Sequence, residues 1–497
     1  MSTKMHSSPT AARSVLLFRK VLSFPVFVAA IFAALIYLFI PQSMADPDIW
    51  WHLRNAQVQI QTHSFIRSDM YSFTALGAPW MNHEWLAELP FYLGWRFLGA
   101  KGLFLVTVTA IETILLGVLY LAYRKSNNIM AALLVSAIAG ILSTVSYGPR
   151  TLLFGWICLI VELLILDRTA ENERSLWALP VLFLIWVNTH GSWLIGLAIL
   201  LVFIVCGSFR ISIGAIEGLA WSRAQLRKLV VVSCLSVSAL FINPYGWRLV
   251  FYPFNLAFRQ KLNIANVEEW KTLDFHSLRG KILLVCLALL FLFQLLRPRP
   301  RKWAPYELAF LFIGVYASFT YSRFLFLAAI LVLPLLARNI PGLSPYRPDR
   351  NKPWLNALIL LALVPFLVRH IPDEAHILGS QNREFPDHAL SYLRDFHPEG
   401  NVLNDYLWGG YLIWHARQIP VFVDSRVDIF EYSGAFEDYL DATHLKNSLS
   451  ILDKYRIRYV FFQKDTPLVY LLEHTAEWKI DYQDDSSVLL ERVSAKP

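Results

Sequence analysis

The stretch that decides the fold is VLSFPVFVAAIFAALIYLFIPQSMADPDIWWHLR, residues 21–54. Its first part, Val21–Ile40, is almost entirely apolar and has the length that a helix needs to cross a bilayer core of about 30 Å. Basic residues, among them Lys4 and Arg13, precede this run, so the positive-inside rule places the N-terminus in the cytoplasm. The polar segment that begins at Met44 is therefore expected outside, directly beside the membrane.

The rest of the chain is similarly apolar. Of its 497 residues, 56% are hydrophobic and only 16% are charged, a composition that excludes an ordinary soluble protein. Apolar runs separated by short charged loops predict about eleven membrane helices. They lie at residues 21–40, 102–123, 129–146, 152–166, 176–188, 193–209, 229–242, 281–296, 306–318, 324–337 and 354–368. The short pair on either side of His190 is also compatible with a re-entrant hairpin.

The charge pattern divides the chain into two regions. Lys and Arg gather on alternate connections between the apolar runs, which predicts a membrane region over residues 1–369 and an outside tail over residues 370–497. From Ile371 onward there are 12 Lys and Arg against 21 Asp and Glu, although the whole chain carries +8. The basic surplus thus belongs to cytoplasmic loops, and no nucleic-acid partner is expected.

The tail lacks the apolar periodicity of the membrane region. Short β-branched and aromatic runs, such as Val421–Val423 and Tyr459–Phe462, alternate there with helix-like stretches and turn residues. We therefore predict a small exported α/β domain. Two polar clusters, Asn404–Tyr411 and Val423–Asp428, are expected at strand ends, with a Gly-Gly turn in the first; they are interpreted either as structural turns and ion pairs or as a ligand-binding edge.

The first outside loop, residues 44–101, carries the clearest functional signal. Asp46 suits the N-cap of a helix and Pro47 its first position, so a surface helix is predicted from here toward Gln61. One polar stripe follows from helical spacing, and it contains Asp48, His52, Asn55 and Gln59. Trp50 and Trp51 are expected to anchor this helix at the interface. Capping alone explains Asp46 but leaves Asp48 and His52 unexplained.

A second polar segment follows in the same loop. Asn82 is a suitable N-cap, and Glu84 and Glu88 would lie one helical turn apart, with His83 beside them. The structural alternative is a solvated helix face. The functional interpretation is a second acidic cluster facing the one on the first helix.

In its architecture the chain resembles the GT-C membrane glycosyltransferases: an acidic motif beside the first membrane helix, surface helices in a long outside loop, about eleven spans and an exported tail. At the level of residues the resemblance rests on Asp46-Pro47-Asp48 and His52. The family includes protein mannosyltransferases, oligosaccharyltransferases and aminoarabinose transferases, which use sugars carried on polyprenyl phosphates or diphosphates. This chain lacks the Asp-Glu pair of the first and the Trp-Trp-Asp signature of the second, so the resemblance selects no subfamily.

The resemblance implies that Asp46 or Asp48, assisted by His52 and Glu84, acts as catalytic base or orients the acceptor. Sugar transfer needs a deprotonated acceptor and a stabilised phosphate leaving group. Substrate- and phosphate-binding residues on the same side are expected to be Arg54, His83, Glu88, Arg150, His190, Arg248 and Arg323. Snorkelling to the interface is the alternative role for the arginines, and a packed turn for His190.

The acidic residues of the first outside loop could also bind a divalent metal ion. Asp46 and Asp48, with His52 and Glu84, offer oxygen and nitrogen ligands for Mg²⁺ or Mn²⁺, and some members of the family need a metal while others do not. The leading hypothesis is an inverting glycosyltransferase at the outer face of a bacterial inner membrane, with membrane lipid and a polyprenyl-phosphate sugar as partners. The alternatives are a transporter or flippase of a glycan lipid, for which Glu112 and Glu162 lie deep in predicted spans, and a non-catalytic envelope assembly subunit.

Overall fold

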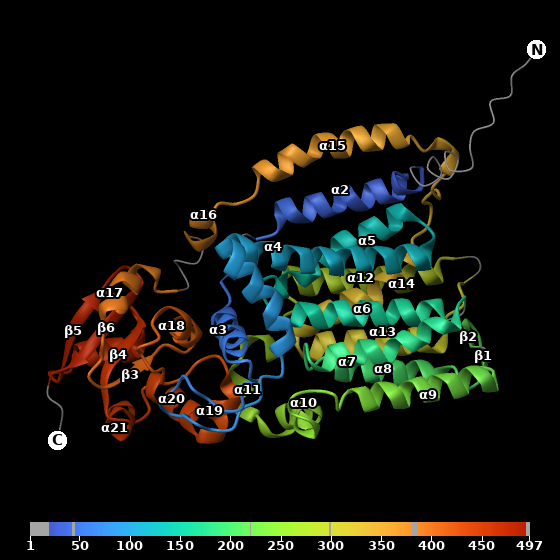
Figure 1. Ribbon diagram of the computed structural model, residues 1–497. Coiled ribbons are helices and arrows are strands. Elements are labelled where there is room, and N and C mark those ends of the chain that lie inside the picture. Colours follow the sequence, from blue (N-terminus) through green and yellow to red (C-terminus); the bar gives the residue numbers. More distant parts are fainter. Residues whose placement is uncertain are drawn as a thin grey trace, which may run out of the picture.

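The computed structural model describes residues 19–41, 45–169, 171–218, 220–297, 300–379 and 385–493. Figure 1 shows long, roughly parallel helices forming a bundle, with the C-terminal tail against one end of it. Lys4, Arg13 and Met44, used above for topology, lie outside the described residues.

A helix forms at each of the apolar runs predicted to cross the membrane. The helices are α2 (Phe24–Phe39), α4 (Trp85–Ser126), α5 (Ile129–Leu142), α6 (Leu152–Arg168), α7 (Leu179–Val187), α8 (Trp193–Cys206), α9 (Arg223–Ala239), α12 (Leu278–Leu295), α13 (Pro305–Thr320), α14 (Leu325–Asn339) and α15 (Pro353–Arg369). Four helical segments of the described chain, Trp85–Ser126, Ile129–Ser146, Leu278–Leu295 and Ser322–Asn339, are long and apolar enough to cross a bilayer by length and composition. The chain is a membrane protein; the count of eleven spans stays a prediction.

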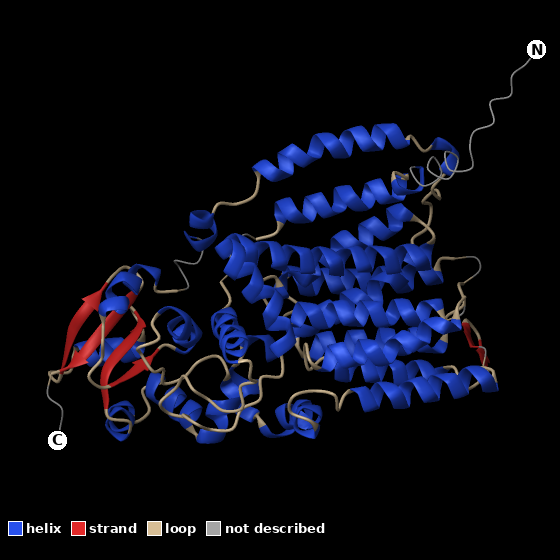
Figure 2. Ribbon diagram, in the orientation of Figure 1, coloured by secondary structure: helices blue, strands red, loops and turns tan. Residues whose placement is uncertain are grey.

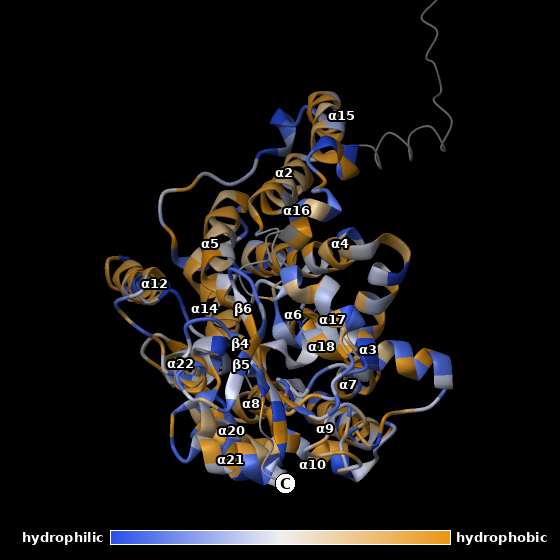
Figure 3. Ribbon diagram, turned by 90° about the vertical axis from the view of Figure 1, so that its left-hand side faces the viewer, coloured by the Kyte–Doolittle hydropathy of each residue, from blue (hydrophilic) through white to orange (hydrophobic). Residues whose placement is uncertain are grey.

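The core of the bundle surrounds α14. This helix is apolar on all sides and almost completely buried, which is typical of a helix at the centre of a bundle. Trp156 of α6 stacks on Phe326 of α14 with 5.9 Å between ring centroids. Figure 3 shows apolar residues over most of the helices of the bundle and a more polar tail.

Helix α4 joins a surface segment to a membrane segment through a break at Gly99 (φ 59°, ψ −143°). An L side chain rarely adopts this conformation, and a Cβ here would also lie 2.5 Å from Oε1 of Glu374. The helix begins at Trp85, with Glu84 at its N-cap. The prediction of Asn82 as the N-cap is wrong, because its amide donates to the Glu88 carboxylate and its Oδ1 accepts from the backbone N–H of Glu84 in the preceding turn.

Two further helices run across the direction of the bundle at the end next to the tail, where Figure 1 shows both nearly end-on. They are α3 (Pro47–Thr62) and α10 (Trp247–Arg259), and α10 is followed by the short α11 (Lys261–Asn266). At the opposite end, β1 (Ile211–Ile213) and β2 (Ile216–Gly218) form a small antiparallel hairpin.

The tail contains a four-stranded mixed sheet, coloured red in Figure 2. Its order is β3-β4-β6-β5, with β3 parallel to β4 and the other pairs antiparallel. The strands are β3 (Asn401–Asn404), β4 (Ile457–Gln463), β5 (Trp478–Gln483) and β6 (Ser487–Arg492). The helices are α16 (Glu374–Gly379), α17 (Leu390–Asp395), α18 (Gly409–His415), α19 (Val427–Ser433), α20 (Ala435–Thr443), α21 (Ser448–Lys454) and α22 (Pro467–Glu473).

The strand predicted at Tyr459–Phe462 is confirmed within β4, but Val421–Val423 is not a strand of the sheet. Val421 instead forms an isolated bridge to Ser72 of the loop that was predicted to lie outside the membrane, residues 44–101. The side chain of Asn404 takes the place of a neighbouring strand, since it accepts from the Phe422 N–H at 2.7 Å and donates to the Val423 carbonyl at 2.8 Å. This segment therefore joins the tail to the loop.

Candidate functional site

The start of α3 holds Asp46 in a fixed position. Its Oδ1 accepts from the backbone N–H of Asp48 at 3.0 Å, and Pro47 occupies the first turn, which confirms the predicted cap. Its Oδ2 lies 2.6 Å from Nε of Arg150, which in turn pairs with Glu269. Asp46 is only 2% exposed, so this ion pair is well shielded from water. Capping and pairing thus occupy both oxygens of Asp46.

Asp48, in the first turn of the same helix, is less constrained. Its Oδ1 accepts from Nε1 of Trp51 at 3.3 Å, and the same N–H lies 3.0 Å from Oγ of Ser425 in the tail. Burial, and then the negative charge of Asp46, raise the pKa of Asp48 to about 6, although His52 and Arg150 act in the opposite direction. A carboxyl with this pKa can gain and lose a proton close to neutral pH.

The two tryptophans of α3 are not interfacial anchors, contrary to the sequence prediction. Trp50 is fully buried and Trp51 is 5% exposed. Trp50 packs edge-on against Tyr411 of α18, with 5.5 Å between ring centroids. The tail covers this face of α3, so these aromatic rings contact protein.

Glu84 is surrounded by three histidines. Nε2 of His190 lies 3.3 Å from its carboxylate, and the Nε2 atoms of His52 and His83 each lie 3.5 Å from it. Burial opposes ionisation of Glu84, but His83, His190 and His52 together outweigh it and lower its pKa. Glu84 is therefore ionised at neutral pH and holds the imidazoles around one carboxylate.

Glu88, one turn further on, fixes the other side of His52. Its Oε1 lies 2.8 Å from Nδ1 of His52 and accepts from Asn55 at 3.2 Å, while its Oε2 accepts from Asn82 at 2.7 Å. Glu88 is fully buried and Glu84 is 9% exposed, so the alternative of a solvated helix face is wrong. Burial lowers the pKa of His52, but the hydrogen bond to Glu88 and the surrounding carboxylates more than compensate, and the net direction is upward.

The His83 ring extends the cluster toward α10. Its centroid is 4.4 Å from that of Tyr252, whose hydroxyl donates to Asp428 of α19 at 3.2 Å. Burial raises the pKa of both Tyr252 and Asp428. His83 thus lies between the first loop, α10 and the tail.

The structure brings together most of the site residues expected from sequence. Asp46, Asp48 and Arg150 gather at the start of α3. The second set, whose His52 interacts electrostatically with Asp48, contains His52, His83, Glu84, Glu88 and His190. Arg323 lies over the Trp270 ring at 4.3 Å, and its charge interacts with Arg150, Glu84 and Asp48. Arg54 and Arg248 lie apart from this group: Arg54 donates to Gln57, and Arg248 is exposed on α10.

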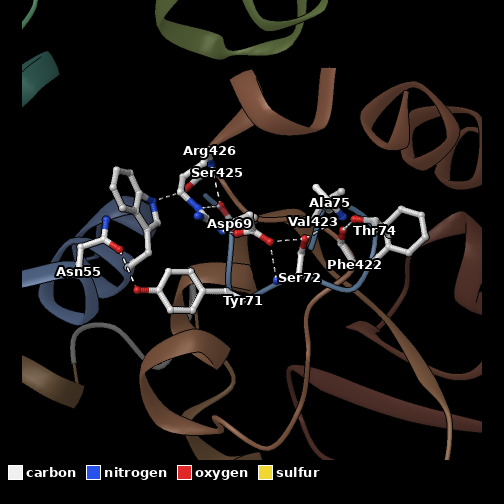
Figure 4. A network of polar contacts seen from close by, with 12 residues as sticks. Asn55, Asp69, Tyr71, Ser72, Thr74, Ala75, Phe422, Val423, Ser425 and Arg426 are labelled. Carbon is white, nitrogen blue, oxygen red and sulfur yellow. Dashed lines mark hydrogen bonds and ion pairs between the residues drawn. The ribbon is translucent and has the colours of Figure 1, made fainter. Parts of the chain in front are cut away.

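The tail is held against the first loop by Arg426. Its guanidinium pairs with Asp424 and, through Nη2, with Asp69 of the loop at 2.7 Å (Figure 4). The rings of Tyr71 and Trp80 lie 5.0 and 4.9 Å from its central carbon. This fully shielded ion-pair group keeps the neighbouring Ser425 beside Trp51.

The expected Gly-Gly turn in the tail is wrong, because Gly409 and Gly410 begin α18. A Cβ at Gly409 would lie 2.3 Å from the Val423 carbonyl, and a Cβ at Gly410 would lie 2.4 Å from the Pro47 carbonyl. These glycines therefore allow close packing of α18 between its own domain and α3.

Solved structures of two other proteins have a similar fold. The structure matches an oligosaccharyltransferase of Archaeoglobus fulgidus tethered to an acceptor peptide, with TM-score 0.52 and 10% identity over 88% of this chain and 68% of that one. It matches ArnT of Cupriavidus metallidurans with undecaprenyl phosphate bound (TM-score 0.51, 13% identity) and in the apo state (TM-score 0.51, 14% identity), each over 97% of this chain and 98% of that one. The chain has the GT-C fold. No family model and no curated protein matches its sequence.

Several residues of this candidate site were missed in the sequence. Ser425 and Asp428 lie in the tail cluster that was noticed, but no pattern connected that cluster with Asp48. Tyr252 of α10 and Glu269 come from the segment between α9 and α12, where nothing in the spacing distinguishes them. Asn82 was taken as a cap, whereas it donates to Glu88.

The donor groups of the candidate site do not fit the expected Mg²⁺ or Mn²⁺. In the described ranges, no group of three or more His, Cys, Asp or Glu residues is arranged to hold a metal ion. Asp46 already binds Arg150 and caps α3, and Glu84 contacts three histidines. Side chains of the protein thus already contact the carboxylate oxygens that a metal would need: Arg150 those of Asp46, and the imidazoles those of Glu84.

Proposed function

We propose that this protein is a glycosyltransferase that moves a sugar from a polyprenyl-phosphate donor to a hydroxyl or amine of a lipid, glycan or protein acceptor. The reaction takes place at the outer face of the membrane. In a bacterium this membrane is the inner, cytoplasmic membrane. The observation that carries the proposal is Asp48: a half-buried carboxyl with a pKa of about 6 beside the cations Arg150 and Arg323.

Asp48 acts as the base in this proposal. The acceptor oxygen or nitrogen attacks the anomeric carbon and loses its proton to Asp48, and the bond from that carbon to the phosphate oxygen breaks with its electron pair remaining on the phosphate. Attack by the acceptor on the face opposite the leaving group inverts the anomeric carbon, and the base must therefore lie on that same face. Trp51 and Ser425 hold the carboxyl in place for this step.

Arg150 and Arg323 bind the phosphate. Both lie in short connections between helices of the bundle, where a lipid phosphate would lie, and both interact electrostatically with Asp48. Arg150 is fixed by Asp46 and Glu269, so it needs little rearrangement when the leaving group gains charge. The binding of undecaprenyl phosphate in ArnT, which has the same fold, supports a donor of this class.

The experiment compares Asp48→Asn, Asp46→Asn and the control Asp441→Asn in membranes supplied with polyprenyl-phosphate sugar. Asn also caps helices, so α3 is expected to form in Asp46→Asn. We expect transfer to fall about 10²- to 10⁴-fold in Asp48→Asn, the usual contribution of a general base. Asp46→Asn also loses transfer, because Arg150 keeps only Glu269 of its two carboxylate partners, and Asp441→Asn does not.

The transporter alternative also has an observation in its favour. Glu162 of α6 is fully buried, and neither of its carboxylate oxygens has a hydrogen-bond partner in the described structure. Ionisable residues in this position often mark transport pathways. Wild-type transfer in both Asp46→Asn and Asp48→Asn, together with lost lipid translocation in Glu162→Gln, would favour a flippase.

A further inference from the structure

Helix α10 has two different faces. Its first face contributes the buried residues Leu249 and Val250, and Tyr252 on the same helix contacts His83 and Asp428 of the candidate site. The other face presents a row of large aromatic side chains at helical spacing. These are Trp247, Phe251, Phe254 and Phe258, which are 62%, 53%, 41% and 76% exposed. The row follows steps of four, three and four residues, so it lies along one side of the helix.

The aromatic row of α10 lies next to the apolar outer surface of the helix bundle. The connection that follows α9, directly before α10, exposes Phe241 and Ile242, so the aromatic row continues the apolar outer surface of the bundle. Between them the chain turns at Gly246, whose φ of 59° an L side chain rarely adopts, and α10 then runs across the bundle direction (Figure 1). A helix in this orientation at the end of a membrane bundle lies in the plane of the interface.

Residues at the edges of the row fit a phospholipid surface. Arg248, Arg259 and Lys261 are exposed on or beside α10. Basic side chains next to a strip of Trp and Phe are the composition of helices that insert aromatic rings between acyl chains and bind lipid phosphates with their cations.

The far end of the segment is held by the tail. The backbone N–H groups of Leu262 and Asn263 in α11 donate to the Glu431 carboxylate of α19 at 2.9 and 3.0 Å. A fixed depth of α10 would therefore also fix the height of the tail above the membrane.

We propose that α10 is an in-plane membrane anchor, whose row Trp247-Phe251-Phe254-Phe258 inserts into the outer leaflet of the phospholipid bilayer. Its opposite face thereby sets the height of Tyr252 and of the tail at the membrane surface. The insertion itself does not depend on the proposed transferase activity.

The test places single cysteines at Phe251, Phe258 and, as control, Tyr470, an exposed aromatic residue of α22 in the tail. The background is the full chain with its four cysteines replaced by serine or alanine. Each cysteine is labelled with an environment-sensitive fluorophore and reconstituted into vesicles of phosphatidylcholine and phosphatidylglycerol. Nitroxides attached to the acyl chains quench labels in the bilayer, and iodide quenches labels in water.

We expect the labels at 251 and 258 to lose fluorescence to the lipid nitroxides and to be protected from iodide, with the opposite result at 470. Quenching by iodide alone at 251 and 258 would place the row in water and overturn the proposal. Protection from both quenchers would mean that protein covers the row, either a second copy of this chain or another partner. That result would also overturn the proposal. Because quenching is independent of sugar transfer, loss of the proposed function alone leaves this result unchanged.

Discussion

Arg426 and Asp69, 357 positions apart in the sequence, form a buried ion pair with 2.7 Å between Nη2 and Oδ1. The Arg426 side chain is 1% exposed and the Asp69 side chain is fully buried. Asp69 also accepts from the backbone N–H and the hydroxyl of Ser72, so the contact holds the loop conformation as well as the tail. The tail is thus fixed to the segment that carries the acidic site.

Replacement of Arg426 by Gln should destabilise the protein strongly. It leaves the carboxylates of Asp69 and Asp424 buried without their cation, which costs about 3–5 kcal/mol for a broken buried pair. Thermal unfolding of the purified full chain measures the effect. Arg458→Gln is the matched control, since Arg458 makes more exposed pairs with Glu399 and Glu491, and such pairs contribute about 0–1 kcal/mol. Equal shifts in the two variants would contradict this assignment.

Transfer activity should depend on the ionisation of Asp48. A base works only when ionised, and burial raises the pKa of Asp48 to about 6, so kcat/KM is expected to rise with pH up to about 6 and then level off. The charge of Arg150 lowers this pKa, and Arg150→Gln should therefore move the midpoint to higher pH in addition to weakening phosphate binding. A profile that does not change through pH 6 would remove Asp48 as the base.

Glu84→Gln should reduce stability in a pH-dependent way. Glu84 and Glu88 help to raise the pKa of His52, and Glu84 raises that of His83. A raised histidine pKa contributes stability that is complete below the ordinary value of about 6.5 and is lost as the pH rises through the folded value. The free energy of unfolding should thus fall by about 1.5–3 kcal/mol in mildly acidic buffer. The difference from wild type should shrink in alkaline buffer, and chemical denaturation at both pH values checks this.

The parts that could be predicted from sequence are local. The Asp46-Pro47 start of α3 follows from capping and from the fixed φ of proline, which involve only neighbouring residues. The helices follow from the length of apolar runs. Glu84, His52 and His190 belong to three polar segments that were predicted only to lie on the same side of the membrane. Their contact could not be predicted, because helical spacing gives a face and not a distance.

The parts that could not be predicted depend on the packing of the tail against the first loop. Trp50 and Trp51 have the composition of a membrane anchor, yet α18 covers them, and no local pattern in residues 44–101 reports this. The bridge between Val421 and Ser72 likewise needs two segments far apart in the chain. Long-range contacts of this kind decide which polar residues of the tail reach the site.

Gly410→Ala tests whether this packing positions Asp48. The added Cβ would lie 2.4 Å from the Pro47 carbonyl, so α18 must move away from α3, and such overpacking costs about 1–3 kcal/mol. Because Pro47 precedes Asp48 and Ser425 contacts Trp51, we expect lower kcat and a shifted midpoint of the pH profile as well as a lower melting temperature. Gly140→Ala is the control, since its Cβ would meet its nearest atom at an ordinary 3.6 Å.

A lower melting temperature in Gly410→Ala, with an unchanged midpoint of the pH profile of activity, would limit the tail to a stabilising role. Only displacement of α3 changes the surroundings of the Asp48 carboxyl.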